Sequence, residues 1–177
     1  MQINNLSLTV LTLKADSIKY GSRCIIKSFI KDPRFRVNFW LRIGCYLNGK
    51  NFLFKSILLR RIKNKLAVKY GFDTTFNVQI GKGLRIIHLG GIVVHGNCTI
   101  GENFTILNNV TLGQGKRNPS FIPAIGNNVY IGVSSVLLGK INIGNNVIIG
   151  ALTFVNKSSS DGITVAGSPM RVIEKDS

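Results

Sequence analysis

Residues 125–155 read IGNNVYIGVSSVLLGKINIGNNVIIGALTFV, and an aliphatic side chain returns at every sixth position of this stretch. The same period runs upstream between residues 80 and 110. A period of six fits neither a helix nor a simple alternating strand, so each hexapeptide is predicted to be a short strand plus a corner with one side chain pointing inward. The inward positions are Ile80, Ile86, Ile92, Cys98, Phe104 and Val110, then Ile125, Ile131, Leu137, Ile143, Ile149 and Val155.

Glycine and asparagine mark the predicted corners, because both tolerate the left-handed backbone angles that turns require. Asn-Asn pairs begin at 108, 127 and 145. Three hexapeptides would close a triangular coil of about eighteen residues, and coils would stack their inward side chains. The predicted fold is mainly β, a left-handed parallel β-helix of about four coils with an N-terminal α-helical segment. A β-sandwich with coincidental spacing is the alternative.

The repeat is interrupted once, because Val110 and Ile125 are fifteen residues apart, which is not a multiple of six. A loop over residues 113–123 is predicted there, and an insertion that a repeat tolerates is a candidate carrier of function. We expect two parts in the chain, a basic, aromatic and mostly helical segment over 1–72 and the β-helix over 73–177.

Positive charge is concentrated in the first part. Residues 1–72 hold 15 Lys and Arg against Asp16 and Asp32, a net of +13, whereas residues 73–177 hold 8 against 5, a net of +3. Asp32-Pro33 is a helix start, and residues 48–51 form a helix break. This segment could cap the open end of the β-helix, steer an anionic substrate, or make peripheral contact with an anionic membrane. Nucleic acid is a disfavoured partner, since no nucleic-acid-binding fold accompanies the charge.

Apolar runs in the chain fall far short of the roughly 20 residues that a membrane-spanning helix needs. Cys24, Cys45 and Cys98 lack metal-ligand spacing and suit a reducing compartment. We expect a cytoplasmic protein, with the inner face of the bacterial inner membrane as a candidate peripheral location.

Two histidines, His88 and His95, are present. His88 lies two residues after an inward position, so its side chain is predicted to point outward, and Asp73 precedes it by fifteen residues. Counting by eighteen places Asp73 near His88 on the neighbouring coil. A carboxylate that holds one imidazole nitrogen leaves the other as a general base near neutral pH. The alternative is a histidine that only satisfies backbone groups at a corner.

Several motifs resemble the serine acetyltransferase branch of the hexapeptide-repeat acyltransferases. They are the segments 72–74, 80–83, 87–94, 110–116 and 165–173. In that family an Asp seven residues before the Ile-Gly pair and a His eight residues after that Ile form the catalytic dyad, and Asp73 and His88 occupy these positions. The resemblance implies acetyl-CoA as co-substrate, no metal, and trimers or paired trimers with active sites between subunits. The shortened N-terminal segment favours a single homotrimer.

Further site residues follow from the resemblance and from charge. The backbone of Gly113 or Gly115 could stabilise an oxyanion, and Lys116, Lys140 and Arg171 could bind the phosphates of CoA. His95, Phe121 and Arg85 are weaker candidates for acceptor contacts. Each could equally be an ordinary surface residue.

Departures from the family pattern concern the acceptor. Where serine acetyltransferases have an Arg-His-Pro-Lys-Ile segment, residues 121–125 read Phe-Ile-Pro-Ala-Ile, and Ile87 replaces an Asp before His88. The carboxylate of free serine would lack its Arg partner. We therefore expect an O-acetyltransferase acting on a sugar hydroxyl of a capsular, exopolysaccharide or lipopolysaccharide O-antigen chain, an acceptor whose negative charge would suit the basic segment. The alternatives are the serine O-acetyltransferase of cysteine biosynthesis and a non-catalytic β-helix scaffold.

Overall fold

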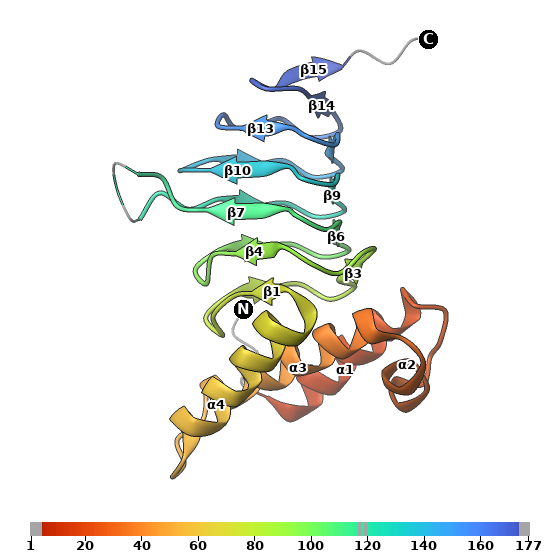
Figure 1. The fold of residues 1–177 in the computed structure, drawn as a ribbon. Coiled ribbons are helices and arrows are strands. Elements are labelled where there is room, and N and C mark those ends of the chain that lie inside the picture. Colours follow the sequence, from red (N-terminus) through yellow and green to blue (C-terminus); the bar gives the residue numbers. More distant parts are fainter. Residues whose placement is uncertain (1–4, 117, 119, 174–177) are drawn as a thin grey trace.

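The computed structural model of the chain describes residues 5–116, 118 and 120–173. A helical segment lies at one end of a column of stacked coils (Figure 1). Its elements are α1 (Leu6–Ile18), α2 (Ile25–Lys31), α3 (Pro33–Asn48), α4 (Lys55–Asn64) and the π-helical turn η1 (Lys65–Lys69). The predicted helix start is confirmed, because the Asp32 side chain accepts a hydrogen bond from the backbone N–H of Arg34 at the beginning of α3.

The strands form three parallel faces. Face A consists of β1 (Phe72–Asp73), β4 (Ile92–Val94), β7 (Thr111–Gly113), β10 (Val136–Leu138) and β13 (Phe154–Val155). Face B consists of β2 (Gln79–Ile80), β5 (Thr99–Ile100), β8 (Ala124–Ile125) and β11 (Asn142–Ile143). Face C consists of β3 (Arg85–Ile86), β6 (Thr105–Ile106), β9 (Tyr130–Ile131), β12 (Ile148–Ile149), β14 (Thr164–Ala166) and β15 (Arg171–Ile173). The strand β15 turns back and pairs antiparallel with β14 at the end opposite the helices (Figure 1).

The repeat contains a second insertion that the sequence concealed. All twelve predicted inward positions are buried. However, Ile86 pairs with Ile106 and Val94 with Leu112, so the step along the column from Ile86 to Val94 is eight residues instead of six. Ile92 is also buried, and the six-residue pattern therefore continued through the longer corner without a visible break. The first coil has twenty residues, as the pairing of Phe72 with Ile92 shows.

The asparagine pairs lie at corners as predicted. The second residue of each pair is left-handed, with φ of +56° at Asn109 and +57° at both Asn128 and Asn146. Their amides also bond from coil to coil, since Asn128 Nδ2 donates to Asn146 Oδ1 at 3.0 Å. These corners let each strand turn into the next face while the coils stay in register.

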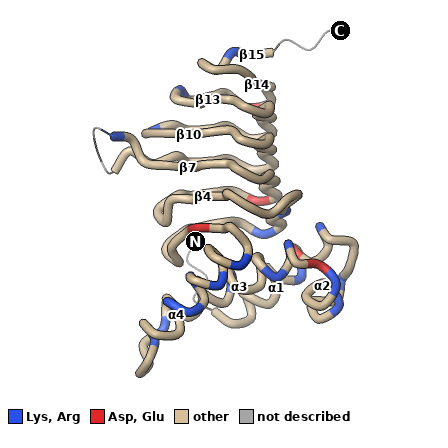
Figure 2. The backbone as a smooth tube through the Cα atoms, viewed as in Figure 1, with Lys and Arg blue, Asp and Glu red and all other residues tan. Residues whose placement is uncertain are grey.

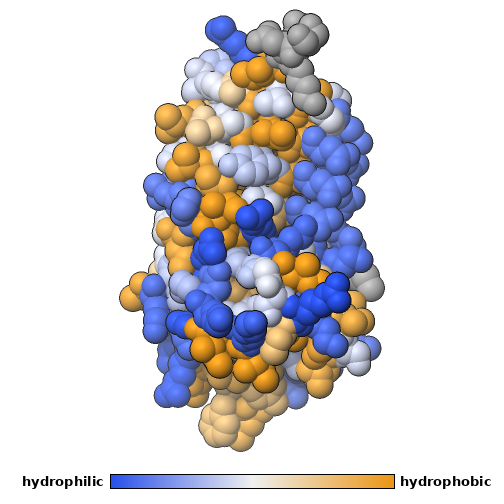
Figure 3. All heavy atoms as spheres, turned by 90° about the vertical axis from the view of Figure 1, so that its right-hand side faces the viewer, coloured by the Kyte–Doolittle hydropathy of each residue, from blue (hydrophilic) through white to orange (hydrophobic). Residues whose placement is uncertain are grey.

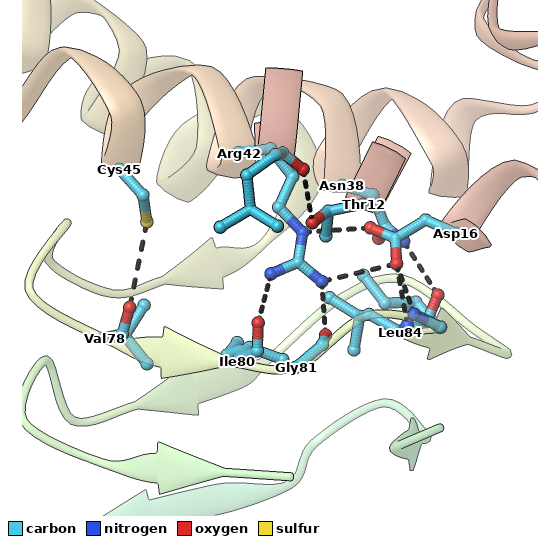
Figure 4. Close-up of polar contacts among 12 residues, drawn as sticks. Thr12, Asp16, Asn38, Arg42, Cys45, Val78, Ile80, Gly81 and Leu84 are labelled. Carbon is cyan, nitrogen blue, oxygen red and sulfur yellow. Dashed lines mark hydrogen bonds and ion pairs between the residues drawn. The ribbon is translucent and has the colours of Figure 1, made fainter. Parts of the chain in front are cut away.

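A buried ion pair fastens the helices to the first coil (Figure 4). Arg42 donates from Nε to Asp16 Oδ2 at 3.0 Å and from Nη2 to the Gly81 carbonyl at 2.7 Å. Asp16 Oδ1 accepts from the backbone N–H groups of Gly83 and Leu84 at 2.8 and 2.9 Å. Helical side chains thus satisfy backbone groups that the open end of a β-helix would leave unpaired.

The helices and the coils share one hydrophobic core. Val37, Leu41, Ile62 and Leu66 from the helices pack in the same buried cluster as the inward residues of the coils. Lysine and arginine are dense along the helical segment and sparse on the coils (Figure 2). Within the described residues, no helix has the length and apolar character to cross a membrane.

Candidate functional site

His88 lies in the long corner between β3 and β4, where face C passes into face A. Its side chain is exposed, as predicted. Gly90 and Gly91 follow with φ of +106° and +64°, angles that a residue with a side chain rarely adopts. A Cβ atom on Gly71 would come within 2.8 Å of Gly90 Cα, so the two backbones touch. The corner that carries His88 therefore packs directly on the chain that leads into β1.

Two residues of the helical segment hold the backbone on the N-terminal side of His88. Arg34 Nη1 donates to the Ile87 carbonyl at 3.1 Å, and the Ile86 N–H donates to the Tyr20 hydroxyl at 2.9 Å. Asp32 in turn accepts from Arg34 Nη2 at 2.6 Å. No local sequence pattern indicates this role, because the contacts join residues more than fifty positions apart.

The charged groups that hold the backbone before His88 form an ion pair of opposite charges, Asp32 and Arg34. Partial burial alone would raise the pKa of the Asp32 carboxyl, but the hydrogen bonds from Arg34 outweigh it and lower that pKa. The same hydrogen bond raises the pKa of Arg34. Burial raises the pKa of Tyr20 above its ordinary value. The Tyr20 hydroxyl thus stays neutral, and the Asp32–Arg34 pair stays ionised, at physiological pH.

Asp73 lies on β1, and its strand partner is Val93 rather than the His88 corner. The nearest cation is Lys63 of α4, whose Nζ is 4.0 Å from Asp73 Oδ1. Among the residues that the structure describes, no hydrogen bond or ion pair joins Asp73 to His88. A coil of eighteen residues would place Asp73 closer to His88 than the actual first coil of twenty residues does. A single chain therefore does not bring the two side chains of the predicted dyad into contact.

A cavity of about 400 Å³ adjoins Asp73 at the edge where face A passes into face B. Lys63, Asp73 and His95 line it, together with Thr74, Thr75, Asn77, Val93, Val94, Gly96 and Asn97. His95 Nδ1 accepts a hydrogen bond from the Asn97 N–H at 3.2 Å. A neutral imidazole that accepts at Nδ1 carries its proton on Nε2, so His95 is arranged here as a donor and not as a base.

The inserted loop stands on the same edge, one coil above His95, and projects from the column (Figure 1). The His95 N–H donates to the Leu112 carbonyl at 2.8 Å, directly before Gly113. The Gly115 N–H donates to the Phe121 carbonyl at 2.8 Å and closes the base of the loop. Phe121 and Lys116 are exposed. Positions 117 and 119 of the predicted loop lie outside the described residues.

The predicted CoA contacts divide between two places. A Cβ atom on Gly115 would lie 3.3 Å from Gly139 Cα, so Lys116 and Lys140 stand on adjacent coils of one corner. Arg171, on β15, lies on face C near the far end of the column, and Arg85, on β3, is exposed on the same face. In the described part of the chain, none of these four cations has an ion pair, and no group of three His, Cys, Asp or Glu could hold a metal ion.

Each chain thus carries the predicted site residues on two different edges. The edge between faces A and B carries Asp73, His95, the loop base with Gly113 and Gly115, and Lys116. The edge between faces C and A carries His88. A site that contains a base, a carboxylate and phosphate-binding cations needs residues from both edges. Two neighbouring subunits can supply them if their β-helices pack edge to edge.

Comparisons with known proteins confirm the resemblance to serine acetyltransferases. No protein-family model matches the chain. A serine acetyltransferase of Staphylococcus aureus (strain Mu50) is 41% identical over 107 residues, which is 60% of this chain and 50% of that protein. The chain thus spans about half the length of the curated relatives it matches.

Solved structures agree with this similarity. Neisseria gonorrhoeae serine acetyltransferase in complex with serine superimposes with a TM-score of 0.78 at 27% identity, covering 96% of this chain and 70% of that one. A serine acetyltransferase in complex with CoA gives 0.82 at 25% identity, covering 95% and 71%. The predicted fold class, a β-helix behind an N-terminal helical segment, is confirmed.

The prediction of a polysaccharide acceptor is wrong, because the relatives and structural neighbours are serine acetyltransferases. It rested on Phe121 and Ile122, which stand where those enzymes have Arg and His. That substitution removes a cation from the loop, but the cavity beside Asp73 receives another, Lys63, from α4. The sequence could not place Lys63 there.

Proposed function

We propose that the chain is an O-acetyltransferase that moves an acetyl group from acetyl-CoA to the hydroxyl of L-serine. The observation that carries this proposal is the 41% identity to a serine acetyltransferase over 107 residues, with Asp73 and His88 at the positions of the family's dyad. The structural neighbours solved with serine and with CoA support the same pair of substrates.

In the proposed reaction His88 takes the proton from the serine hydroxyl as its oxygen attacks the thioester carbon. Asp73 stabilises the imidazolium, and the backbone of Gly113 donates to the oxyanion of the tetrahedral intermediate, because the Gly115 N–H is already bonded to the Phe121 carbonyl. The carbon–sulfur bond then breaks, and the imidazolium returns the proton to the thiolate of CoA. O-acetylserine and free CoA leave, and no covalent enzyme intermediate forms.

The site is proposed to form between two subunits of a homotrimer. One subunit contributes His88, and its neighbour contributes Asp73, His95 and the loop base. Lys63 of the neighbour binds the serine carboxylate in place of the missing loop arginine, and His95 donates to the acceptor from Nε2. Both Lys63 and Asp73 are about half exposed, with side-chain exposures of 45% and 56%, so their 4.0 Å pairing leaves Lys63 able to bind the serine carboxylate and Asp73 able to pair with His88.

Acetyl-CoA is proposed to follow the edge of the column above this cavity. Lys116 and Lys140 face its phosphates from adjacent coils, whereas Arg171 lies on face C, away from this edge. Phe121 closes the acceptor side of the loop, whereas Arg85 lies on face C, away from the cavity, and takes no part in the reaction.

Both substrates are water-soluble, so the reaction itself requires no membrane. We place it in the cytoplasm, where acetyl-CoA is made and where Cys24, Cys45 and Cys98, all free, remain reduced. Peripheral contact with an anionic membrane would be a separate property of the helical segment, independent of the acetyl transfer.

Release of CoA thiol tests the function. The protein with acetyl-CoA and L-serine should release thiol in proportion to O-acetylserine detected by mass spectrometry, and serinol, which lacks the carboxylate, should react far more slowly. A non-catalytic scaffold would release no thiol above the buffer control. Equal rates with serine and serinol would contradict recognition of the carboxylate.

A further inference from the structure

The loop before α4 and the first turns of α4 leave a row of apolar side chains in solvent. We call this surface the α4 tip, and it consists of Phe52, Leu53, Phe54, Ile57 and Leu58, all of them exposed. Leu53 and Phe54 are exposed by 79% and 67%. The tip lies at the helical end of the molecule, directed away from the coils (Figure 1). A contiguous apolar surface of this kind marks an interaction site more often than isolated exposed side chains do.

The backbone at the tip is held in an unusual conformation. Phe54, which precedes the first residue of α4, has a left-handed φ of +67°. This region is unfavourable for an aromatic residue, and such conformations cluster at functional surfaces. A glycine would relieve the strain, but it would remove the aromatic side chain from solvent. The chain therefore maintains a strained turn whose result is an outward-facing phenylalanine.

The charge around the tip is of one sign. The basic residues that adjoin the tip are Lys50, Lys55, Arg60 and Arg61. Segment 1–72 contains two acidic residues, Asp16 and Asp32. Both are withdrawn from solvent, with side-chain exposures of 0% and 15%, and both are paired with arginines. The helical segment therefore exposes cations and apolar groups without acidic groups between them. On the side of this segment that carries α2, Figure 3 shows hydrophobic and hydrophilic residues interleaved.

This charge favours one class of occupant. A second copy of the chain docking through the same surface would bring two strongly positive ends together, which like-charge repulsion opposes. An anionic lipid bilayer instead offers negative headgroups for the basic residues and an acyl boundary for the apolar ones. Basic side chains that flank exposed aromatic and aliphatic groups have the composition of interfacial anchors.

We propose that the α4 tip is a membrane anchor that binds bilayers containing anionic phospholipids. Leu53 and Phe54 enter the boundary between headgroups and acyl chains, and the neighbouring basic side chains bind the headgroups. The Asp73 cavity lies at the other end of α4, next to Lys63, so docking leaves it open to solvent. The anchor is independent of the acetyl transfer.

Vesicle flotation with the full chain tests the anchor. We expect binding to vesicles of phosphatidylcholine with 30% phosphatidylglycerol, and at least about tenfold weaker binding to phosphatidylcholine alone. Raising the salt from 0.05 to 0.5 M should weaken binding to the anionic vesicles, because screening suppresses surface electrostatics. The double variant L53S/F54S should bind at least about tenfold more weakly than the wild type, since it loses both apolar anchors.

The matched control is Leu152→Ser, which removes a side chain that is 72% exposed at a corner of the coils. It should bind vesicles as the wild type does. Equal binding to neutral and anionic vesicles, or wild-type binding by L53S/F54S, would overturn the proposal. A change in oligomeric state of L53S/F54S on sedimentation would also overturn it, because the tip would then be an interface between copies. Thiol release with serine should be unchanged in L53S/F54S, so failure of the anchor and failure of the enzymatic proposal are separable.

Discussion

At the scale of single residues, the two histidines differ in what their nitrogens can do. His88 is exposed at a corner fixed by Arg34 and Tyr20, and it has no bonded partner among the described residues. His95 already accepts a hydrogen bond at Nδ1. Replacing His88 by Ala should lower kcat by roughly 100- to 10,000-fold, the range that a general base contributes. His95→Ala should act mainly on the KM for serine, measured by thiol release at varied serine.

The relative size of the two effects decides the assignment. If His95→Ala lost more kcat than His88→Ala, the general base would be His95 and its hydrogen bond with Asn97 would have to break during the reaction. Circular dichroism of both variants controls for misfolding, which is not expected because neither side chain belongs to the core.

The proposed recognition of the serine carboxylate by Lys63 can be tested with a single substitution. Lys63→Met removes the ammonium group that faces Asp73 and keeps the length of the side chain. A hydrogen bond to a charged group contributes about 1.5–3 kcal/mol, so the KM for serine should rise roughly ten- to a hundredfold. The rate with serinol should hardly change, because serinol has no carboxylate.

The matched control for Lys63 is Arg60→Met, an exposed cation one turn earlier on α4. It lowers the net charge equally and should leave the KM for serine within about twofold. A similar rise in both variants would mean that Lys63 acts through general electrostatic steering and not through contact with the carboxylate.

At the scale of elements, the contact between helices and coils depends on the Asp16–Arg42 pair. Both side chains are almost fully buried, and together they bond to backbone groups of residues 80–84. Asp16→Ala would leave the buried Arg42 charge without its carboxylate and two backbone N–H groups without partners. The free energy of unfolding should fall by about 3–5 kcal/mol, the cost of breaking a buried pair from one side. Urea denaturation followed by circular dichroism measures it.

The exposed pair of Lys82 and Glu102, 3.4 Å apart, supplies the comparison. Glu102→Gln should cost less than about 1 kcal/mol, because solvent screens such a pair. Equal losses for the two variants would indicate that the helices are not fastened through Asp16.

The sequence could predict the β-helix because burial and turn chemistry are local. The inward aliphatics and the left-handed asparagines such as Asn128 each report their own environment. It could not predict the eight-residue step between Ile86 and Val94, since Ile92 is also buried and kept the pattern continuous. Arg34, Lys63 and Asp16 were likewise beyond prediction, because their partners lie far away in the chain.

At the scale of the whole molecule, one hydrophobic core runs through both parts of the chain. The division at residue 72 is therefore proposed as a change of architecture and not as a boundary between units that fold separately. The proposed site residues are not separated at residue 72. They lie on two different edges of the β-helix. His88 stands on the edge between faces C and A, and Asp73 stands toward the edge between faces A and B.

This placement predicts complementation between inactive chains. His88→Ala and Asp73→Asn should each reduce thiol release at least about a hundredfold as homotrimers. If His88 of one subunit works with Asp73 of the next, a mixed trimer restores every site at which an Asp73→Asn chain donates its histidine to a His88→Ala neighbour. Every mixed trimer holds one complete site among its three, and purification through two different tags removes both homotrimers, so the co-expressed chains should recover about one third of wild-type activity. Homotrimers mixed after purification serve as the control and should stay inactive. Mixed trimers that contain both chains and remain inactive would place the pair within a single subunit, where the corner at Gly90 would have to move to bring His88 to Asp73.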